Sequence, residues 1–322
     1  MNLVSRLARA SRSWVSLAVA ACAALSTGCG GGGSAGAGSA RDPSSSGSDS
    51  GGETKSGVGT EKDAELAGAT GKSESFGDAQ TLAAFKSKLA PATLRGVVRL
   101  DLAGRGWGPE LGKVLAASTA VDKLVALDVS DNELGPEGAS ALAKSTRFAA
   151  LRQLDIAGND IGDGGATSLA QSALLSSIKV LNLSGNSIAA GGVRALLSSG
   201  KLAHVASLDL SMNPIAAEGA QGLASAADLA QLRSLFLLGS DIGEAGARAI
   251  AGSSVLTNMQ VLALSGNAIG DEGTKALAAS KVLLNVTTLD LSANAISDDG
   301  AKALADSAEL KSIKSLELFG ND

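Results

Sequence analysis

Residues 124–142 read LVALDVSDNELGPEGASAL, and close copies of this stretch recur to the end of the chain. The aliphatic residue that opens each copy stands 27 residues after the one before, with no insertion. The opening residues are Val97, Leu124, Leu151, Ile178, Val205, Leu232, Met259, Val286 and Ile313. A fixed period of roughly 20 to 50 residues is typical of proteins that stack one structural unit. The sequence therefore predicts a solenoid over residues 97–322, with eight full repeats and a terminal partial repeat.

Each repeat combines two hydrophobic patterns. If the opening residue is position one, positions four and six are also aliphatic, as at Leu127 and Val129. This alternation predicts a short strand with one face in the core. Position eleven is apolar again, and a segment rich in Gly and Ala follows, with acidic residues near its start. Acidic residues favour a helix N-terminus, so we expect a helix there and an α/β fold class. Glycines recur in this segment, for example Gly246, where we expect the helix to approach the sheet closely.

Position nine is asparagine in seven of the nine copies. An amide buried just after a strand can donate to and accept from the backbone of its own repeat and of the next one. We expect these residues to form a structural ladder: Asn132, Asn159, Asn186, Asn213, Asn267, Asn294 and Asn321.

The consensus LxxLxLxxN followed by I/L-G-x-x-G-A-x-x-L-A resembles that of leucine-rich repeats, and its strand-plus-helix form is similar to the ribonuclease-inhibitor class. The resemblance covers residues 97–322. It implies a curved solenoid with a parallel sheet on the concave face and helices on the convex face. It says nothing about activity.

The first 28 residues are typical of an export signal. They carry a basic start and an apolar stretch at residues 14–25, which is too short to cross a bilayer comfortably. Residues 25–29 resemble the box of bacterial lipoprotein signal peptides, which ends in a lipidated cysteine, here Cys29; Ser26 stands where that family usually has Leu. Cys22 also ends such a box and is the alternative site, and cleavage without lipid is a third possibility. Cys29 is favoured because a flexible sequence starts at the next residue. By the same resemblance, Gly30 after the cysteine implies sorting to the outer membrane.

The segments between the signal and the repeats differ in composition. Residues 29–77 are rich in Gly and Ser and hold too little apolar surface to fold, which predicts a disordered tether. Residues 78–96 contain a helical pattern, with Asp78 as a possible N-cap and with Leu82, Phe85 and Leu89 on one face. We expect this helix to cap the first repeat, whose apolar end would otherwise be exposed.

The composition argues against catalysis and against nucleic acid. The repeats contain no Cys or Tyr, and His204 is the single histidine of the chain, so neither a catalytic triad nor a metal-ligand cluster is present; no metal or cofactor is expected. The net charge is −5, and removal of the leader with its three arginines leaves about −8. No basic stripe is present to replace phosphate counterions.

Candidate partner-binding residues lie at strand positions that point away from the core. Position five is acidic in six repeats: Asp101, Asp128, Asp155, Asp209, Asp290 and Glu317. The sixth repeat departs from the pattern, with Phe236 in place of the acid, Leu238 in place of Ser or Ala, and Ser240 in place of the ladder Asn; Arg233 flanks them. Exposed Phe and Leu on a polar surface predict a contact patch. The alternatives are a merely solvated acidic face and simple drift of one repeat.

These features predict a lipid-anchored, non-catalytic scaffold that binds a protein or peptide at the concave face. The alternative is a structural or cell-wall-associated envelope protein. Regulation of a GTPase, as in some relatives of this repeat class, is disfavoured because it needs a cytoplasmic partner. The last strand has an unpaired edge, and dimerisation through it is a further hypothesis.

Overall fold

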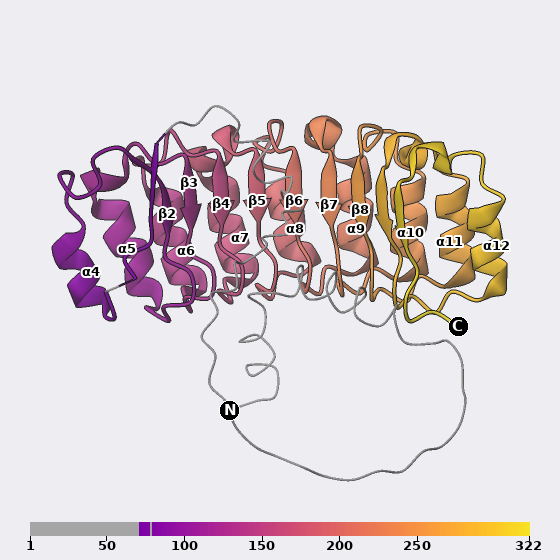
Figure 1. Ribbon diagram of the computed structural model, residues 1–322, viewed down its shortest axis with the longest axis horizontal. Helices are drawn as coiled ribbons and strands as arrows, with labels where there is room; N and C mark the ends of the chain where they lie inside the picture. Colours follow the sequence, from indigo (N-terminus) through magenta and orange to yellow (C-terminus); the bar gives the residue numbers. More distant parts are fainter. Residues whose placement is uncertain (1–70, 78) are drawn as a thin grey trace, which may run out of the picture. The chain divides into compact units, whose positions relative to one another are not determined.

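The computed structural model describes residues 71–77 and 79–322, in which ten strands form one parallel sheet in chain order, β1 to β10. In Figure 1 the strands stand in one row and the helices in a second row behind them. Each strand connects through a helix to the next strand of the same sheet, which confirms the predicted α/β repeat solenoid. The leader, both cysteines, residues 29–70 of the tether and Asp78 lie outside the described residues.

The strands are short and evenly spaced. They are β1 (Lys72–Glu74), β2 (Val97–Asp101), β3 (Ala126–Asp128), β4 (Gln153–Asp155), β5 (Val180–Asn182), β6 (Ser207–Asp209), β7 (Ser234–Phe236), β8 (Val261–Ala263), β9 (Thr288–Asp290) and β10 (Ser315–Glu317). From β2 onward, residues 27 apart are register partners, so each strand position lines up across the sheet.

The helices follow the same period. They are α4 (Leu82–Lys88), α5 (Pro109–Ala117), α6 (Gly135–Lys144), α7 (Gly162–Gln171), α8 (Ala190–Leu197), α9 (Ala216–Ser225), α10 (Gly243–Ala251), α11 (Gly270–Ala278) and α12 (Asp298–Ala305). Short 3-10 turns link some helices to the next strand: η2 (Thr119–Val121), η3 (Ala173–Ser177), η4 (Ala227–Gln231), η5 (Lys281–Asn285) and η6 (Leu310–Ser312). Among the described residues, no helix combines the length and apolar character needed to cross a membrane.

The core is a stack of equivalent aliphatic layers between sheet and helices. Strand positions four and six are almost fully buried in the inner repeats, as at Leu235 and Leu237 of the sixth repeat. Ile242 at position eleven and Ile250 of α10 complete that layer. Each repeat thus depends on its neighbours for the apolar surface it cannot bury alone.

The recurrent helix glycines serve a different contact from the expected one. A Cβ added at Gly246 would lie 2.7 Å from the Cβ of Ile242 and 3.0 Å from the Cβ of Ala220 in α9. The close approach is therefore to the preceding helix and to the position-eleven side chain, and the prediction of an approach to the sheet is wrong. Glycine is needed because the helices pack tightly side by side.

The N-terminal cap is larger than predicted. The predicted tether, residues 29–77, is wrong at its C-terminal end, because β1 pairs with β2 and Phe76 is only 4% exposed. Phe76 meets Phe85 of α4 edge-on, with ring centroids 5.3 Å apart, and Phe85 stacks on Trp107 at 5.1 Å. Thr81 caps α4 by accepting a hydrogen bond from the Ala84 amide at 3.2 Å. This aromatic cluster covers the first repeat.

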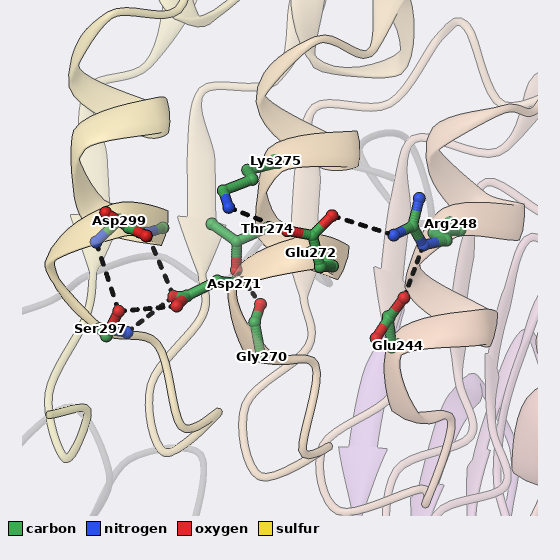
Figure 2. Close-up of polar contacts among 10 residues, drawn as sticks. Glu244, Arg248, Gly270, Asp271, Glu272, Thr274, Lys275, Ser297 and Asp299 are labelled. Atoms are coloured by element: carbon green, nitrogen blue, oxygen red, sulfur yellow. Dashed lines mark hydrogen bonds and ion pairs between the residues drawn. The ribbon is translucent and has the colours of Figure 1, made fainter.

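Acidic residues in the helix segments also link neighbouring repeats, as Figure 2 shows for the C-terminal helices. The carboxylate of Asp271, in α11, accepts hydrogen bonds from the Ser297 amide at 2.8 Å and hydroxyl at 2.6 Å, and from the Gly300 amide at 3.1 Å. These bonds hold the pKa of Asp271 below its ordinary value, first through the Ser297 hydroxyl. One helix thus supplies the cap for the N-terminus of the next.

Candidate binding surface on the free face of the sheet

The face of the sheet that the helices leave uncovered, called here the free face, is formed by strand positions three, five and seven. At position five the register pairs Asp101 with Asp128 and Asp128 with Asp155. Asp290 and Glu317 are paired in the same way further along the sheet. The structure thus places the predicted carboxylates in one row, separated by a strand spacing of about 4.8 Å where they are consecutive.

The carboxylates are held by their own turns. Asp128 accepts hydrogen bonds from the Ser130 amide at 2.9 Å and hydroxyl at 2.7 Å. Burial raises the pKa of Asp128, as does repulsion from Asp155 and to a lesser extent from Asp101. The Ser130 bonds lower the pKa but do not cancel this effect, and the pKa reaches about 6. The row is therefore a region of concentrated negative charge whose full ionisation is unfavourable.

The fifth strand interrupts the row with an amide. The Oδ1 of Asn182 accepts hydrogen bonds from the Ser184 amide and hydroxyl, as the Asp128 carboxylate does from Ser130. The Nδ2 of Asn182 donates a hydrogen bond to Oδ2 of Asp155 at 2.9 Å. Beyond it Asp209 accepts the Ser211 amide at 2.9 Å and has Phe236 as its register partner. The acidic row is thus interrupted at the sixth and seventh repeats, by Phe236 and Ala263, and resumes at Asp290.

The sixth repeat carries an apolar patch on the free face. Phe236 and Leu238 are both half-buried there, and Arg233 is exposed three residues before Phe236. Met212 of the fifth repeat joins them: its amide donates to the Leu238 carbonyl at 2.7 Å, and its sulfur lies 3.0 Å from where a Cβ on Gly239 would stand. With 67% of its surface exposed, Met212 is the most exposed large apolar residue of the patch.

Met212 is the residue that sequence reasoning missed. It stands at position eight, which is glycine in six of the nine repeats, and its φ is 56°, in the left-handed region that disfavours side chains. A large side chain at a glycine position was the available signal. Because the position lies outside the alternating strand pattern, its exposure on this face could not be read from that pattern.

The asparagine ladder fixes the turns that carry these side chains. Nδ2 of Asn159 donates to the carbonyls of Val129, Ile156 and Ala157, each at 2.9 Å. Its Oδ1 accepts the amides of Asn132 and Leu134, each at 3.1 Å. At the sixth repeat Ser240 replaces the amide and makes only 3.3 Å contacts to the Leu210 and Leu238 carbonyls. The ladder is weakest beside the apolar patch.

A second candidate surface lies on the helix side of the sheet. A hollow of about 400 Å³ lies on the helix side, lined in part by Lys86, Glu110 and Lys113. Glu110 pairs with both lysines, at 3.3 Å and 3.4 Å, so the charges of this hollow are already matched. Within residues 71–77 and 79–322, no group of three or more His, Cys, Asp or Glu side chains is placed to hold a metal ion.

Comparison with known proteins identifies the repeat. The family model described as a leucine-rich repeat matches residues 123–143, 150–170, 175–197, 201–224, 255–278 and 282–305. The matched ranges leave out residues 225–254, which include Phe236 and Leu238 of the apolar patch. No curated protein matches the chain.

Two solved structures align with this chain at low sequence identity. A protein from Bacteroides fragilis aligns at 13% identity and a TM-score of 0.49, covering 71% of this chain and 70% of that one. A TLR13–ssRNA13 complex aligns at 19% identity and a TM-score of 0.43, covering 74% of this chain but only 34% of that one. The repeat matches, taken with the ten-stranded parallel sheet and its row of helices, show that the chain contains leucine-rich repeats stacked as an α/β solenoid.

Proposed function

We propose that this protein is a non-catalytic scaffold that binds a protein or peptide through the free face of its sheet. Leucine-rich repeat scaffolds commonly mediate protein binding, and the observation that carries the proposal here is the apolar patch of Met212, Phe236 and Leu238. Other repeats have mainly Gly, Asp and Ser at these positions. Exposed apolar clusters on a polar surface are typical of contact sites. Nucleic acid is not the expected ligand, because a row of carboxylates would repel phosphate.

Site-specific photo-crosslinking tests this function. A photoreactive amino acid replaces Phe236 or, as the control, the exposed Gln221 on α9. We expect a discrete adduct with one partner from position 236 only, and loss of that adduct when Leu238 is also changed to Asp. Adducts of equal yield at both positions, or none at either, would exclude a specific ligand on the free face. That result would favour the alternative, a structural or cell-wall-associated envelope protein.

We also propose that the scaffold is anchored to the bacterial envelope as a lipoprotein. The support is the leader sequence with its cysteine, Cys29 or alternatively Cys22, followed by a Gly/Ser-rich tether. The expected location is the outer membrane, facing the periplasm or the cell surface. Mass spectrometry of the mature N-terminus after labelling with a fatty acid distinguishes the two cysteines, and an unmodified cytosolic product would refute the anchor. A GTPase-regulating role is disfavoured because export removes the protein from cytoplasmic GTPases.

The strand-plus-helix repeats further favour the ribonuclease-inhibitor-like class. Each of the repeats that begin between Val97 and Val286 pairs its strand with an α-helix of eight to ten residues. The recurrent helix glycines allow these helices to pack closely, as at Gly246.

A further inference from the structure

On the free face between β7 and β10, the side chains differ in size and polarity from strand to strand, and these differences indicate the chemistry of a ligand. At position seven the side chains of successive repeats are Leu238, Ser265, Ser292 and Phe319. Backbone hydrogen bonds of 2.8 to 2.9 Å run from Gly239 to Ser265, from Gly266 to Ser292 and from Ala293 to Phe319, so these residues lie at one level on adjacent repeats. Two large apolar side chains are thus separated by two small polar ones.

The large residues at the two ends differ in exposure. Phe319 is 61% exposed, whereas Leu238 is half-buried beside the exposed Met212. They stand three strand steps apart, which is about 14 Å at a spacing of about 4.8 Å. Two apolar anchor points at this separation can hold two side chains of one partner segment.

The level below, at position five, supplies charge. There the sequence from β7 to β10 is Phe236, Ala263, Asp290 and Glu317. Among the hydrogen bonds of the described residues, the carboxylate of Asp290 accepts only the one from the Ser292 amide, and that of Glu317 only the one from the Ser315 hydroxyl. Neither carboxylate forms an ion pair within this part of the chain. A cation from a partner would therefore meet two carboxylates without displacing an existing one.

The positive charges of this surface lie elsewhere. Arg233 and Lys314 occupy position two, three residues before the acidic level, which is about 10 Å along the strand. The surface thus carries Asp290 between its apolar ends and Glu317 on the strand that leads to Phe319, and it is basic only at its margin. This arrangement favours a ligand with a basic residue between two apolar residues.

The spacing selects the conformation of that ligand. In an extended segment, residues i, i+2 and i+4 share one face, and i to i+4 spans about 13 Å. This matches the separation of about 14 Å between Leu238 and Phe319. A helix would need about nine residues to span the same distance.

On the basis of the proposed function, we propose that the β7–β10 surface, formed by Met212, Phe236, Leu238, Asp290, Glu317 and Phe319, binds an extended peptide of the pattern apolar–x–Lys/Arg–x–apolar. The two apolar side chains seat on Leu238 and Phe319, and the basic side chain pairs with Asp290 or Glu317. Met212 and Phe236 widen the first of these apolar contacts.

Three labelled peptides test this proposal by fluorescence anisotropy with the full chain. Each places one sequence between identical Gly/Ser flanks: F-T-K-T-F, F-T-E-T-F with the charge reversed, or F-T-K-T-T-F with the spacing changed. We expect the first peptide to bind at least about tenfold more tightly than either of the others, and its affinity to fall as salt is raised.

Charge exchange then locates the site. The double variant Asp290→Lys/Glu317→Lys is expected to reverse the preference and bind F-T-E-T-F more tightly. Asp306→Lys, an exposed charge reversal at the end of α12, is the control for a reversal outside this surface and should keep the wild-type preference. The variant Met212→Gly/Phe236→Asp/Leu238→Ser restores residues that other repeats carry, so it should fold and lose at least about tenfold in affinity.

Equal binding of the three peptides, a preference that the double Lys variant leaves unchanged, or full affinity in the restored variant would each overturn the inference. Crosslinking from position 236 is read independently. A partner that is crosslinked at position 236 but lacks the pattern apolar–x–Lys/Arg–x–apolar would support the scaffold function and refute this class of ligand.

Discussion

At the scale of single residues, Met212 combines a stability cost with an exposed apolar surface. Its φ of 56° suits glycine, which occupies the equivalent site in most repeats, and a side chain there costs roughly 1 kcal/mol. We expect Met212→Gly to raise the free energy of unfolding by about that amount in urea denaturation. Binding of the F-T-K-T-F peptide should weaken in the same variant. Loss of stability would show that Met212 is a packing residue instead of a surface contact.

Asp128 makes stability depend on pH. Because its pKa is raised to about 6 in the folded state, the folded protein holds this proton more tightly than the unfolded chain does. The contribution is fully present below about pH 4 and is lost as pH rises through 6. Asp128→Asn should therefore stabilise the protein at pH 7.5, by about 3 kcal/mol at most, and have little effect at pH 4.

Asn182 shows that the sheet accepts this substitution, since it already makes the equivalent bonds in the fifth strand. Thermal unfolding at the two pH values measures the effect. Asp101→Asn, at the exposed end of the same row, is the control and should change the melting temperature less. An equal gain at pH 4 and pH 7.5 would mean that charge is not the cause.

The residue scale also shows what could be predicted. Phe236 and Leu238 were identifiable because they replace a repeated acid and a repeated small residue at outward positions. Met212 was missed because position eight lies in the turn, where only the backbone geometry shows which way the side chain points. Likewise the raised pKa of Asp128 depends on the register that places Asp101 and Asp155 beside it.

At the scale of elements, the asparagine ladder determines how firmly one repeat is joined to the next. Ser240 cannot reproduce the bonds of an asparagine, and the Ile215 amide bonds instead to the Asn213 carbonyl at 2.7 Å. Ser240→Asn should complete the ladder and raise the free energy of unfolding by about 1–2 kcal/mol, at about 1 kcal/mol for each bond gained. Urea denaturation with an unchanged m-value would establish this.

Asn159→Ala provides the opposite change, because it leaves the buried amides of Asn132 and Leu134 without an acceptor. It also removes one of the donors to the carbonyls of Val129, Ile156 and Ala157, each of which keeps another donor. The expected loss is about 3 kcal/mol or more. If Ser240→Asn destabilises the protein, the backbone of the turn at the sixth repeat differs from that of the other repeats and does not accommodate an asparagine.

The boundaries of the elements explain the remaining differences from the predictions. The period of 27 residues determines strand and helix positions from Val97 onward. Strand β1 has no such period, and its three residues, Lys72–Glu74, are polar; only pairing with β2 and the burial of Phe76 make it part of the fold. Long-range contacts of this kind cannot be read from a local pattern.

At the scale of the whole described array, the position of a repeat decides what its core residues contribute. Leu289 and Leu316 are register partners at strand position four, yet Leu289 is 0% exposed and Leu316 is 38% exposed, because a neighbouring strand covers only one side of β10. Leu289→Ala should cost about 2–5 kcal/mol and Leu316→Ala about 1 kcal/mol or less. Since each repeat contacts only its neighbours, the same gradient should appear in amide hydrogen exchange, with β10 exchanging faster than β9 and β9 faster than β6. Equal costs for the two substitutions, together with uniform protection, would mean that the array unfolds as one unit and that its C-terminal repeat is covered in solution, as a second copy pairing through β10 would do.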